Sequence, residues 1–231
     1  MPARLRPTAA IAADAILVGD PGRALLLAQE LLQQPKMSNH ARGLWGYSGL
    51  TPGGHELTIQ ATGMGGPSAA VVLRDLAELG VRRAVRVGTC AAVAPEGDRG
   101  RLKLGDPVVV SEALAERGGT APPGEGGPPV HPMAPPDPLL TDRLLTVLGD
   151  VPAVVAVSRD TLSQPGQEAP PASEVADMQT ASLFATAAEC KVAIAALLIV
   201  AELRDGRRIP DGELEAAAKR AGAATGRVLS A

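Results

Sequence analysis

The sequence predicts one α/β domain, and two observations support this prediction. Short apolar runs alternate along the chain with segments rich in helix-forming residues, which is typical of strands and helices that follow one another. The chain has 231 residues, of which 45% are hydrophobic. A chain of this length buries enough surface to need no disulfide or metal, so we expect residues 1–231 to form a single domain.

The first half of the chain repeats a pattern of strand, turn and helix. Each apolar run adjoins a turn that contains glycine, and two of these turns lead into a segment of good helix formers. The expected strands are residues 15–18, 57–61, 84–87 and 107–110. The expected helices are residues 24–32 and 67–79.

A segment rich in glycine and proline, residues 118–138, separates the two halves. We expect a long surface loop there, which either lies over a pocket or only links its neighbours. Beyond it, the same patterns predict helices over residues 139–148, 181–190 and 211–231, and strands over residues 153–157 and 192–200. The last of these strands is a continuous apolar run, so we expect it to be buried.

Composition and charge exclude several classes of protein. No apolar run approaches the roughly 18 residues of a membrane span, and residues 1–13 lack the apolar stretch of a secretory signal. We therefore expect a soluble, cytoplasmic protein with no membrane partner. The formal net charge of −3 comes without a basic cluster, so a nucleic acid polymer is not an expected partner.

The cysteines and histidines indicate no metal site. Cys90 and Cys190 are too few and too far apart for a disulfide framework or a zinc site, and we expect both to be reduced. His40, His55 and His131 show no metal-ligand spacing with a cysteine or a carboxylate cluster. No cofactor motif is evident, so we expect neither a metal nor an organic cofactor.

The turn after the first strand has the residues of an anion site. Asp20 can cap the following helix, Pro21 fits its first position, and Gly19 lets a ligand approach the backbone. Arg23 adds a positive charge near the helix N-terminus, where exposed N–H groups favour anions. The alternative is an ordinary capped helix without a ligand.

A second candidate for the same anion is Arg86, which interrupts an apolar strand just before Gly88 and Thr89. Burying an unpaired guanidinium costs several kcal/mol, so Arg86 must meet either a bound anion or a carboxylate. The sequence leaves these two alternatives open.

These segments and three others resemble the nucleoside phosphorylases, a family that includes hexameric purine nucleoside phosphorylases and uridine phosphorylases. The matching segments keep the family's order and spacing over roughly residues 14 to 110, and the resemblance weakens afterwards. They are Gly19-Asp20-Pro21-Gly22-Arg23, Asn39-His40-Ala41-Arg42-Gly43, Thr62-Gly63-Met64-Gly65-Gly66-Pro67-Ser68, Arg86-Val87-Gly88-Thr89 and Leu104-Gly105-Asp106.

The resemblance implies a three-layer α/β fold with a mixed, partly barrel-like central sheet flanked by helices. It implies that inorganic phosphate is a co-substrate, held by Gly19, Arg23, Arg86 and Thr89. It also implies that Arg42 reaches the site of a neighbouring subunit, as in a hexamer built from dimers. The physical reading agrees, because a phosphate dianion needs several guanidinium, hydroxyl and backbone donors.

For the sugar, the resemblance implies contacts from Met64, Met178 and Gln179. The family holds ribose hydroxyls with a Glu-Met-Glu run, and this chain has Asp177-Met178-Gln179 in its place. An amide can accept a hydrogen bond from a hydroxyl but brings no negative charge to balance a positively charged sugar in the transition state. We therefore expect weaker catalysis. The two methionines can also be read as core filler.

For the base, the implied contacts are Cys90, Ala91, Leu162 and Gln167. The stretch around Gln167 resembles the segment with which uridine phosphorylases read uracil, and this favours uridine as the substrate. Leu162 stands where those relatives carry an aromatic side chain, and Ala169 replaces an arginine, so base affinity should suffer.

Two residues are candidates for catalysis, Arg86 and Glu202. Glu202 occupies the place of the aspartate that protonates the leaving base in purine-cleaving relatives, which requires a raised pKa. A surface ion pair with Arg204 is the alternative. The sequence thus predicts a pentosyltransferase that cleaves a nucleoside with phosphate, with a purine as the alternative substrate. A binding protein that has lost efficient turnover is the other alternative, and the complete set of phosphate donors argues against a hydrolase.

Overall fold

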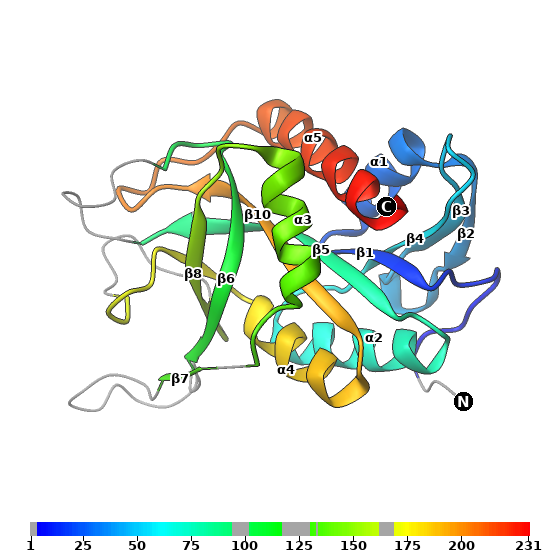
Figure 1. Cartoon of the computed structure of the whole chain (residues 1–231), viewed down its shortest axis with the longest axis horizontal. Helices are drawn as coiled ribbons and strands as arrows, with labels where there is room; N and C mark the ends of the chain where they lie inside the picture. Colours follow the sequence, from blue (N-terminus) through cyan, green and yellow to red (C-terminus); the bar gives the residue numbers. More distant parts are fainter. Residues whose placement is uncertain (1–3, 94–101, 117–129, 133, 162–168) are drawn as a thin grey trace.

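The computed structural model describes residues 4–93, 102–116, 130–132, 134–161 and 169–231 (Figure 1). The helices are α1 (Pro21–Leu31), α2 (Gly66–Glu78), α3 (Pro138–Leu148), α4 (Thr180–Cys190) and α5 (Asp211–Ser230), with a short 3-10 turn η1 (Ala41–Gly43). The strands are β1 (Asp14–Val18), β2 (Gln33–Asn39), β3 (Gly46–Leu50), β4 (Glu56–Ala61), β5 (Arg83–Ala92), β6 (Pro107–Glu116), β7 (Val130–Pro132), β8 (Ala153–Arg159), β9 (Val175–Asp177) and β10 (Ala193–Glu202).

All strands of the described residues belong to one mixed sheet. Its order is β10-β6-β8-β9-β5-β1-β4-β3-β2, and β7 pairs with β6. Strand β10 pairs with β5 as well as with β6, so five strands close into a ring while β1 to β4 extend from it as an open sheet. The predicted mixed, partly barrel-like sheet is therefore confirmed.

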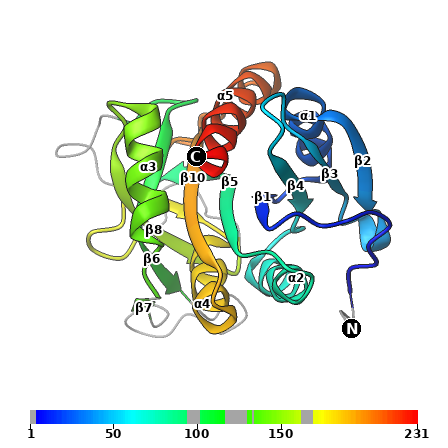
Figure 2. The ribbon, with the colours of Figure 1, turned by 45° about the vertical axis from the view of Figure 1, so that its right-hand side comes forward.

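Helices cover both faces of this sheet. In Figures 1 and 2, α2 and α4 lie together on one side, and α1, α3 and α5 lie on the other. Strand β1 shows why both layers are needed, because Ala15 and Leu17 point into one hydrophobic cluster and Ile16 and Val18 into the other. All four side chains are fully buried, as expected for a strand that is covered on both faces.

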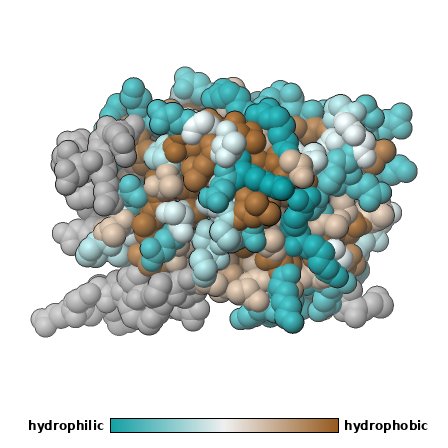
Figure 3. All heavy atoms as spheres, viewed as in Figure 1, coloured by the Kyte–Doolittle hydropathy of each residue, from teal (hydrophilic) through white to brown (hydrophobic). Residues whose placement is uncertain are grey.

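The outer surface of the layer formed by α3 and α5 carries both hydrophilic and apolar side chains. In the space-filling view, hydrophilic side chains border apolar ones along the middle of this face (Figure 3). Single exposed apolar side chains, such as that of Leu139 on α3, are common on protein surfaces. Within the described part of the chain, no helix has the length and apolar content to cross a membrane.

The predicted elements are present, and three of the differences from prediction are instructive. Strands β5 and β6 run beyond their apolar segments, to Ala92 and Glu116. Strands β2, β3 and β9 were not predicted, because β2 is polar and mostly exposed and β9 has only three residues. The loop expected over residues 118–138 is corrected at its end, where residues 130–132 pair with β6 and Asp137 caps α3. Residues 118–129 lie outside the described part.

The topology brings several strand ends to one edge of the sheet. Strand β1 is parallel to both β4 and β5, and β5 is parallel to β10, so the carboxyl ends of these four strands point the same way. Ligands of α/β sheets bind at this edge. The turns that follow β1 and β4, which carry predicted site residues, therefore lie together.

Candidate active site

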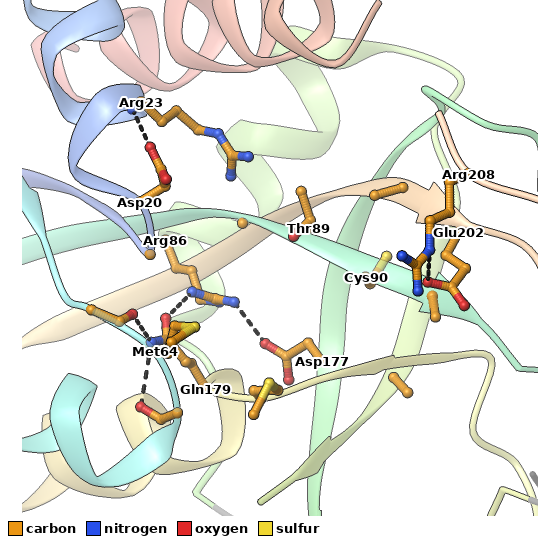
Figure 4. A pocket seen from close by; sticks show the side chains of 18 of the residues that line it. Asp20, Arg23, Met64, Arg86, Thr89, Cys90, Asp177, Gln179, Glu202 and Arg208 are labelled. Carbon is orange, nitrogen blue, oxygen red and sulfur yellow. Dashed lines mark hydrogen bonds and ion pairs between the residues drawn. The ribbon is translucent and has the colours of Figure 1, made fainter. Parts of the chain in front are cut away.

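A cavity of about 660 Å³ lies at this edge of the sheet (Figure 4). Its walls come from the β1–α1 turn, the β4–α2 turn, the end of β5, the segment before α4 and the end of β10. Ten of the residues proposed from the sequence line it together: Gly19, Arg23, Met64, Arg86, Thr89, Cys90, Ala91, Met178, Gln179 and Glu202.

Three other proposed residues are not part of this cavity as described. Leu162 and Gln167 lie outside the described residues. Arg42 is exposed on η1 and does not line the cavity of its own chain. Its backbone has φ 60° and ψ 20°, a left-handed conformation that is uncommon for a residue other than glycine.

The β1–α1 turn has the predicted cap. Oδ1 of Asp20 accepts a hydrogen bond from the backbone N–H of Arg23 at 2.7 Å, and Pro21 occupies the first turn of α1. At Gly19, a Cβ atom would stand 3.5 Å from the Gly63 carbonyl oxygen. The two glycine turns therefore lie side by side at the cavity wall.

The guanidinium of Arg23 points into the cavity (Figure 4). Burial lowers the pKa of Arg23; Asp20 opposes this shift, and the nearby charge of Arg86 adds to it. Among the described residues, no side chain or carbonyl forms a hydrogen bond or ion pair with this guanidinium. The helix terminus thus presents to the cavity a positive charge that Asp20 offsets only in part.

Arg86, by contrast, is held by the protein. Its Nη2 pairs with Oδ2 of Asp177 at 2.9 Å, its Nη1 donates to Oε1 of Gln179 at 2.5 Å, and its Nε donates to Oγ1 of Thr180 at 3.1 Å (Figure 4). The carboxylate that the sequence required for Arg86 is therefore present. A guanidinium has five N–H donors, so two remain for a ligand.

Asp177 is the carboxylate partner, and its own side chain is completely buried. Besides Arg86, it accepts hydrogen bonds from Thr180 through both the backbone N–H and Oγ1, and from Oγ of Ser158. Asp177 thus caps the start of α4 and has no group free toward the cavity.

Gln179 lies between Arg86 and the β4–α2 turn and is only 3% exposed. Its Oε1 also accepts from Oγ1 of Thr62 at 3.1 Å, and its Nε2 donates to the carbonyl oxygens of Gly63 at 2.6 Å and Gly65 at 3.3 Å. Both ends of the amide are therefore engaged by the protein, although the Thr62 hydroxyl also donates to the Val18 carbonyl oxygen at 3.0 Å.

The methionines form the apolar part of the wall. Met64 is 88% exposed at the tip of the β4–α2 turn, and Met178 is half-buried. Met64 is thus not core filler, which was the alternative for both methionines. Gly63 and Gly65 on either side of it have φ 73° and 79°, conformations that only glycine adopts readily.

Cys90 and Ala91 continue β5 at the back of the cavity. Burial raises the pKa of the Cys90 thiol far above its usual range, Asp177 raises it further, and Arg86 only partly opposes this shift. Its Sγ donates to the carbonyl oxygen of Ile199 at 3.6 Å. Cys90 is therefore a neutral, apolar contact.

Glu202 closes the opposite end of the cavity. The pairing of β10 with β5 shifts register between Val200 and Glu202, and such a bulge re-aims a side chain. Oε2 of Glu202 pairs with Nε of Arg208 at 3.0 Å. The ion pair expected with Arg204 is thus corrected, because the chain turns back so that Arg208 stands opposite Glu202, while Arg204 donates to the Val93 carbonyl.

The cavity residues that were not proposed as site residues from the sequence include Asp177 and Arg208. Asp177 occupies a matching position of the family's run, but only the structure shows its pairing with Arg86. Arg208 follows another arginine in a polar segment, where nothing in the sequence marks it. Within the described ranges, no three His, Cys, Asp or Glu side chains come together as a metal site.

Comparisons with known proteins identify the relatives of this chain. A family model described as the phosphorylase superfamily matches residues 14–231. The chain is 42% identical over 84 residues to a DeoD-type purine nucleoside phosphorylase of Oceanobacillus iheyensis, a match covering 36% of this chain and 35% of the relative. It is 36% identical over 107 residues to one of Caldanaerobacter subterraneus, covering 46% and 44%. The matches span less than half the length of these curated relatives.

Solved structures share the fold over nearly the whole chain. A structure from a study of uridine phosphorylases of the oomycete Phytophthora capsici has a TM-score of 0.81 at 21% identity, and the match covers 98% of this chain and 92% of that one. A purine nucleoside phosphorylase from Toxoplasma gondii, in complex with immucillin-H, has a TM-score of 0.74 at 21% identity, covering 96% and 93%.

Proposed function

The chain belongs to the phosphorylase superfamily, and we propose that it is a nucleoside phosphorylase that cleaves a nucleoside with phosphate to a free base and ribose 1-phosphate. The observation that carries this proposal is the guanidinium of Arg23, which faces the cavity without a partner among the described residues. A half-buried charge of this kind is stabilised by an anion.

The phosphate would be held by Arg23, by the two free N–H groups of Arg86, by the Thr89 hydroxyl and by the backbone at Gly19. In the reaction, a phosphate oxygen forms a bond to the anomeric carbon of the sugar. The bond to the base breaks, and the base leaves with the electron pair and takes up a proton. Positioning and charge neutralisation by the protein supply most of the catalysis in such a reaction.

The sugar would lie against Met64 and Met178, with Gln179 beneath it. Asp177 and Gln179 use their polar groups within the protein, so the proposed sugar wall offers thioethers rather than a free carboxylate. This supports the expectation of slow turnover. It also motivates the alternative of a family member that binds phosphate or nucleoside with little or no catalysis.

The base would lie near Cys90 and Ala91. Uridine is the substrate that the sequence around Gln167 favours. A specific observation supports a purine as the second candidate, because Glu202 and its partner Arg208 line the same cavity. A carboxyl group there could deliver the proton that a departing purine needs.

We also propose an oligomer in which Arg42 completes the site of a neighbouring subunit, as in a hexamer of dimers. Arg42 is exposed and is not among the residues that line the cavity of its own chain, which supports this role. A charged side chain held in a strained backbone conformation on the surface is a common feature of functional sites.

The test is release of base from uridine and from inosine, each with and without phosphate. We expect phosphate-dependent release from at least one nucleoside and formation of ribose 1-phosphate in equal amount. Release that is independent of phosphate would indicate a hydrolase. Phosphate binding in calorimetry without release from either nucleoside would favour the binding protein over the enzyme.

A further inference from the structure

The hydrogen bonds of the Gln179 side chain could not be predicted from its position in the sequence. It immediately precedes α4, and its amide forms four hydrogen bonds within the protein, from Arg86 and Thr62 to Oε1 and from Nε2 to Gly63 and Gly65. An amide has two donor hydrogens and two acceptor lone pairs. Nε2 therefore has two carbonyl partners, and Oε1 accepts from Arg86 and shares the single hydrogen of the Thr62 hydroxyl with the Val18 carbonyl oxygen.

These bonds join three parts of the cavity that are distant in sequence. Arg86 belongs to β5, Gln179 stands at the start of α4, and Gly63 and Gly65 form the turn that carries Met64. A Cβ atom at Gly19 would also stand 3.8 Å from Oε1 of Gln179, so the β1–α1 turn packs against the same amide. Gln179 is the point at which the proposed phosphate and sugar walls meet.

The pattern of partners requires an amide. Two of the partners are carbonyl oxygens, which need a donor, and the other two are donors, which need an acceptor. A carboxylate of the same size could still accept from Arg86 and Thr62, but it would face the carbonyl oxygens of Gly63 and Gly65 without a hydrogen. Glutamate at this position would thus lose the two hydrogen bonds that hold the Gly63–Gly65 turn.

We propose that Gln179 is a positioning residue, whose amide fixes the guanidinium of Arg86 and the Gly63–Gly65 turn relative to each other. Asp177 holds the same guanidinium from its other side. With both partners in place, two N–H groups of Arg86 are left without a bond to the described residues, and Arg23 is near enough for the charge of Arg86 to lower its pKa. This role rests on the proposed function, because the walls that Gln179 joins are the proposed phosphate and sugar sites.

The test compares Q179E and Q179M with the wild-type chain of 231 residues, and Q60E serves as the matched control. Gln60 is a second fully buried glutamine whose Nε2 donates to backbone carbonyls, those of Leu44 and Ala61 at 2.9 Å, but it does not line the cavity. Three measurements are made on each protein: inorganic phosphate binding by calorimetry, hydrogen exchange of peptides covering residues 62–68, and kcat and KM for uridine and inosine phosphorolysis.

We expect both Gln179 variants to bind phosphate about tenfold more weakly, as lost charge-assisted hydrogen bonds do, and to exchange faster over residues 62–68. The KM for phosphate should rise more than the KM for nucleoside. Q60E should lose thermal stability yet bind phosphate within about twofold of wild type.

A Q179E variant with unchanged phosphate binding and increased kcat would overturn the proposal, since it would make Gln179 a direct sugar contact. Equal weakening of phosphate binding by Q60E would overturn it as well, because the weaker binding would then follow from lost protein stability and not from the position of Gln179. If the wild type binds phosphate but releases no base, the proposed enzyme fails while the binding and exchange results still decide the role of Gln179. If it binds no phosphate, the proposed phosphate site fails and unchanged exchange over residues 62–68 would refute the positioning role separately.

Discussion

Two arginines of one cavity differ in how their charge is balanced. Arg86 is buried, and its guanidinium is bonded to Asp177, Gln179 and Thr180. Arg23 reaches the cavity from a helix terminus and has no such partner among the described residues. The difference teaches that two arginines from the motifs of one site can have different roles. Arg86 organises the walls of the site, and Arg23 supplies the charge that an anion can neutralise.

The largest effect should follow from R86M. Removing this guanidinium leaves the Asp177 carboxylate buried without a counter-charge, which typically costs about 3–5 kcal/mol. Chemical denaturation measures the loss in free energy of unfolding. The control is R83M on the same strand, whose partner Asp14 is buried but whose own side chain is 34% exposed. We expect R83M to lose less free energy of unfolding than R86M. An equal loss would mean that the ion pair of Arg86 contributes no more to stability than the partly exposed pair of Arg83.

A second effect concerns binding rather than folding. R23M should weaken phosphate binding by about tenfold to a hundredfold, the range for charge-assisted hydrogen bonds. Its free energy of unfolding should stay the same or rise, because desolvation of an unpartnered guanidinium opposes folding. Calorimetry with phosphate and chemical denaturation separate the two quantities. A loss of stability like that of R86M would contradict the contrast between the two arginines.

The contrast also shows how far the sequence could predict this site. Asp20, Pro21 and Gly19 act through local geometry, and their cap formed as predicted. The alternation of elements likewise predicted most of the fold, because burial on both faces makes strands such as β1 continuously apolar. Local patterns were sufficient wherever the partners of a residue lay nearby in the chain.

Long-range pairing could not be predicted in the same way. Arg86 and Asp177 are 91 positions apart, and Gln179 and Gly63 are 116 positions apart. The resemblance aligned Gln179 with a sugar-binding glutamate, but only the structure shows that carbonyl oxygens face its amide. Arg208 escaped prediction for a similar reason, because a turn of the chain, and no local pattern, brings it to Glu202.

Arg208 is intermediate between Arg23 and Arg86, because its charge has a carboxylate partner but its side chain is exposed. It is 74% exposed and pairs with Glu202, so R208A should change stability by no more than about 1 kcal/mol. If Glu202 acts on a purine, we expect kcat for inosine to fall several-fold and kcat for uridine to change less, because Arg208 orients the carboxyl group. R207A is the control, since the neighbouring Arg207 pairs with Asp205 outside the cavity. If R207A and R208A lower kcat for inosine equally, the proposal that Glu202 protonates a departing purine is contradicted.

The smallest effect tests how completely Asp177 neutralises Arg86. A free guanidinium beside Cys90 would favour the thiolate, yet burial and Asp177 together keep the pKa of this thiol far above its usual range. The thiolate therefore forms only at strongly alkaline pH. At pH 8, iodoacetamide should label the partly buried Cys190 and leave the buried Cys90 unmodified in the native protein, with both labelled after denaturation, as mass spectrometry would report. Rapid native labelling of Cys90 would mean that the charge of Arg86 is available inside the cavity, and that the two arginines are more alike than their contacts indicate.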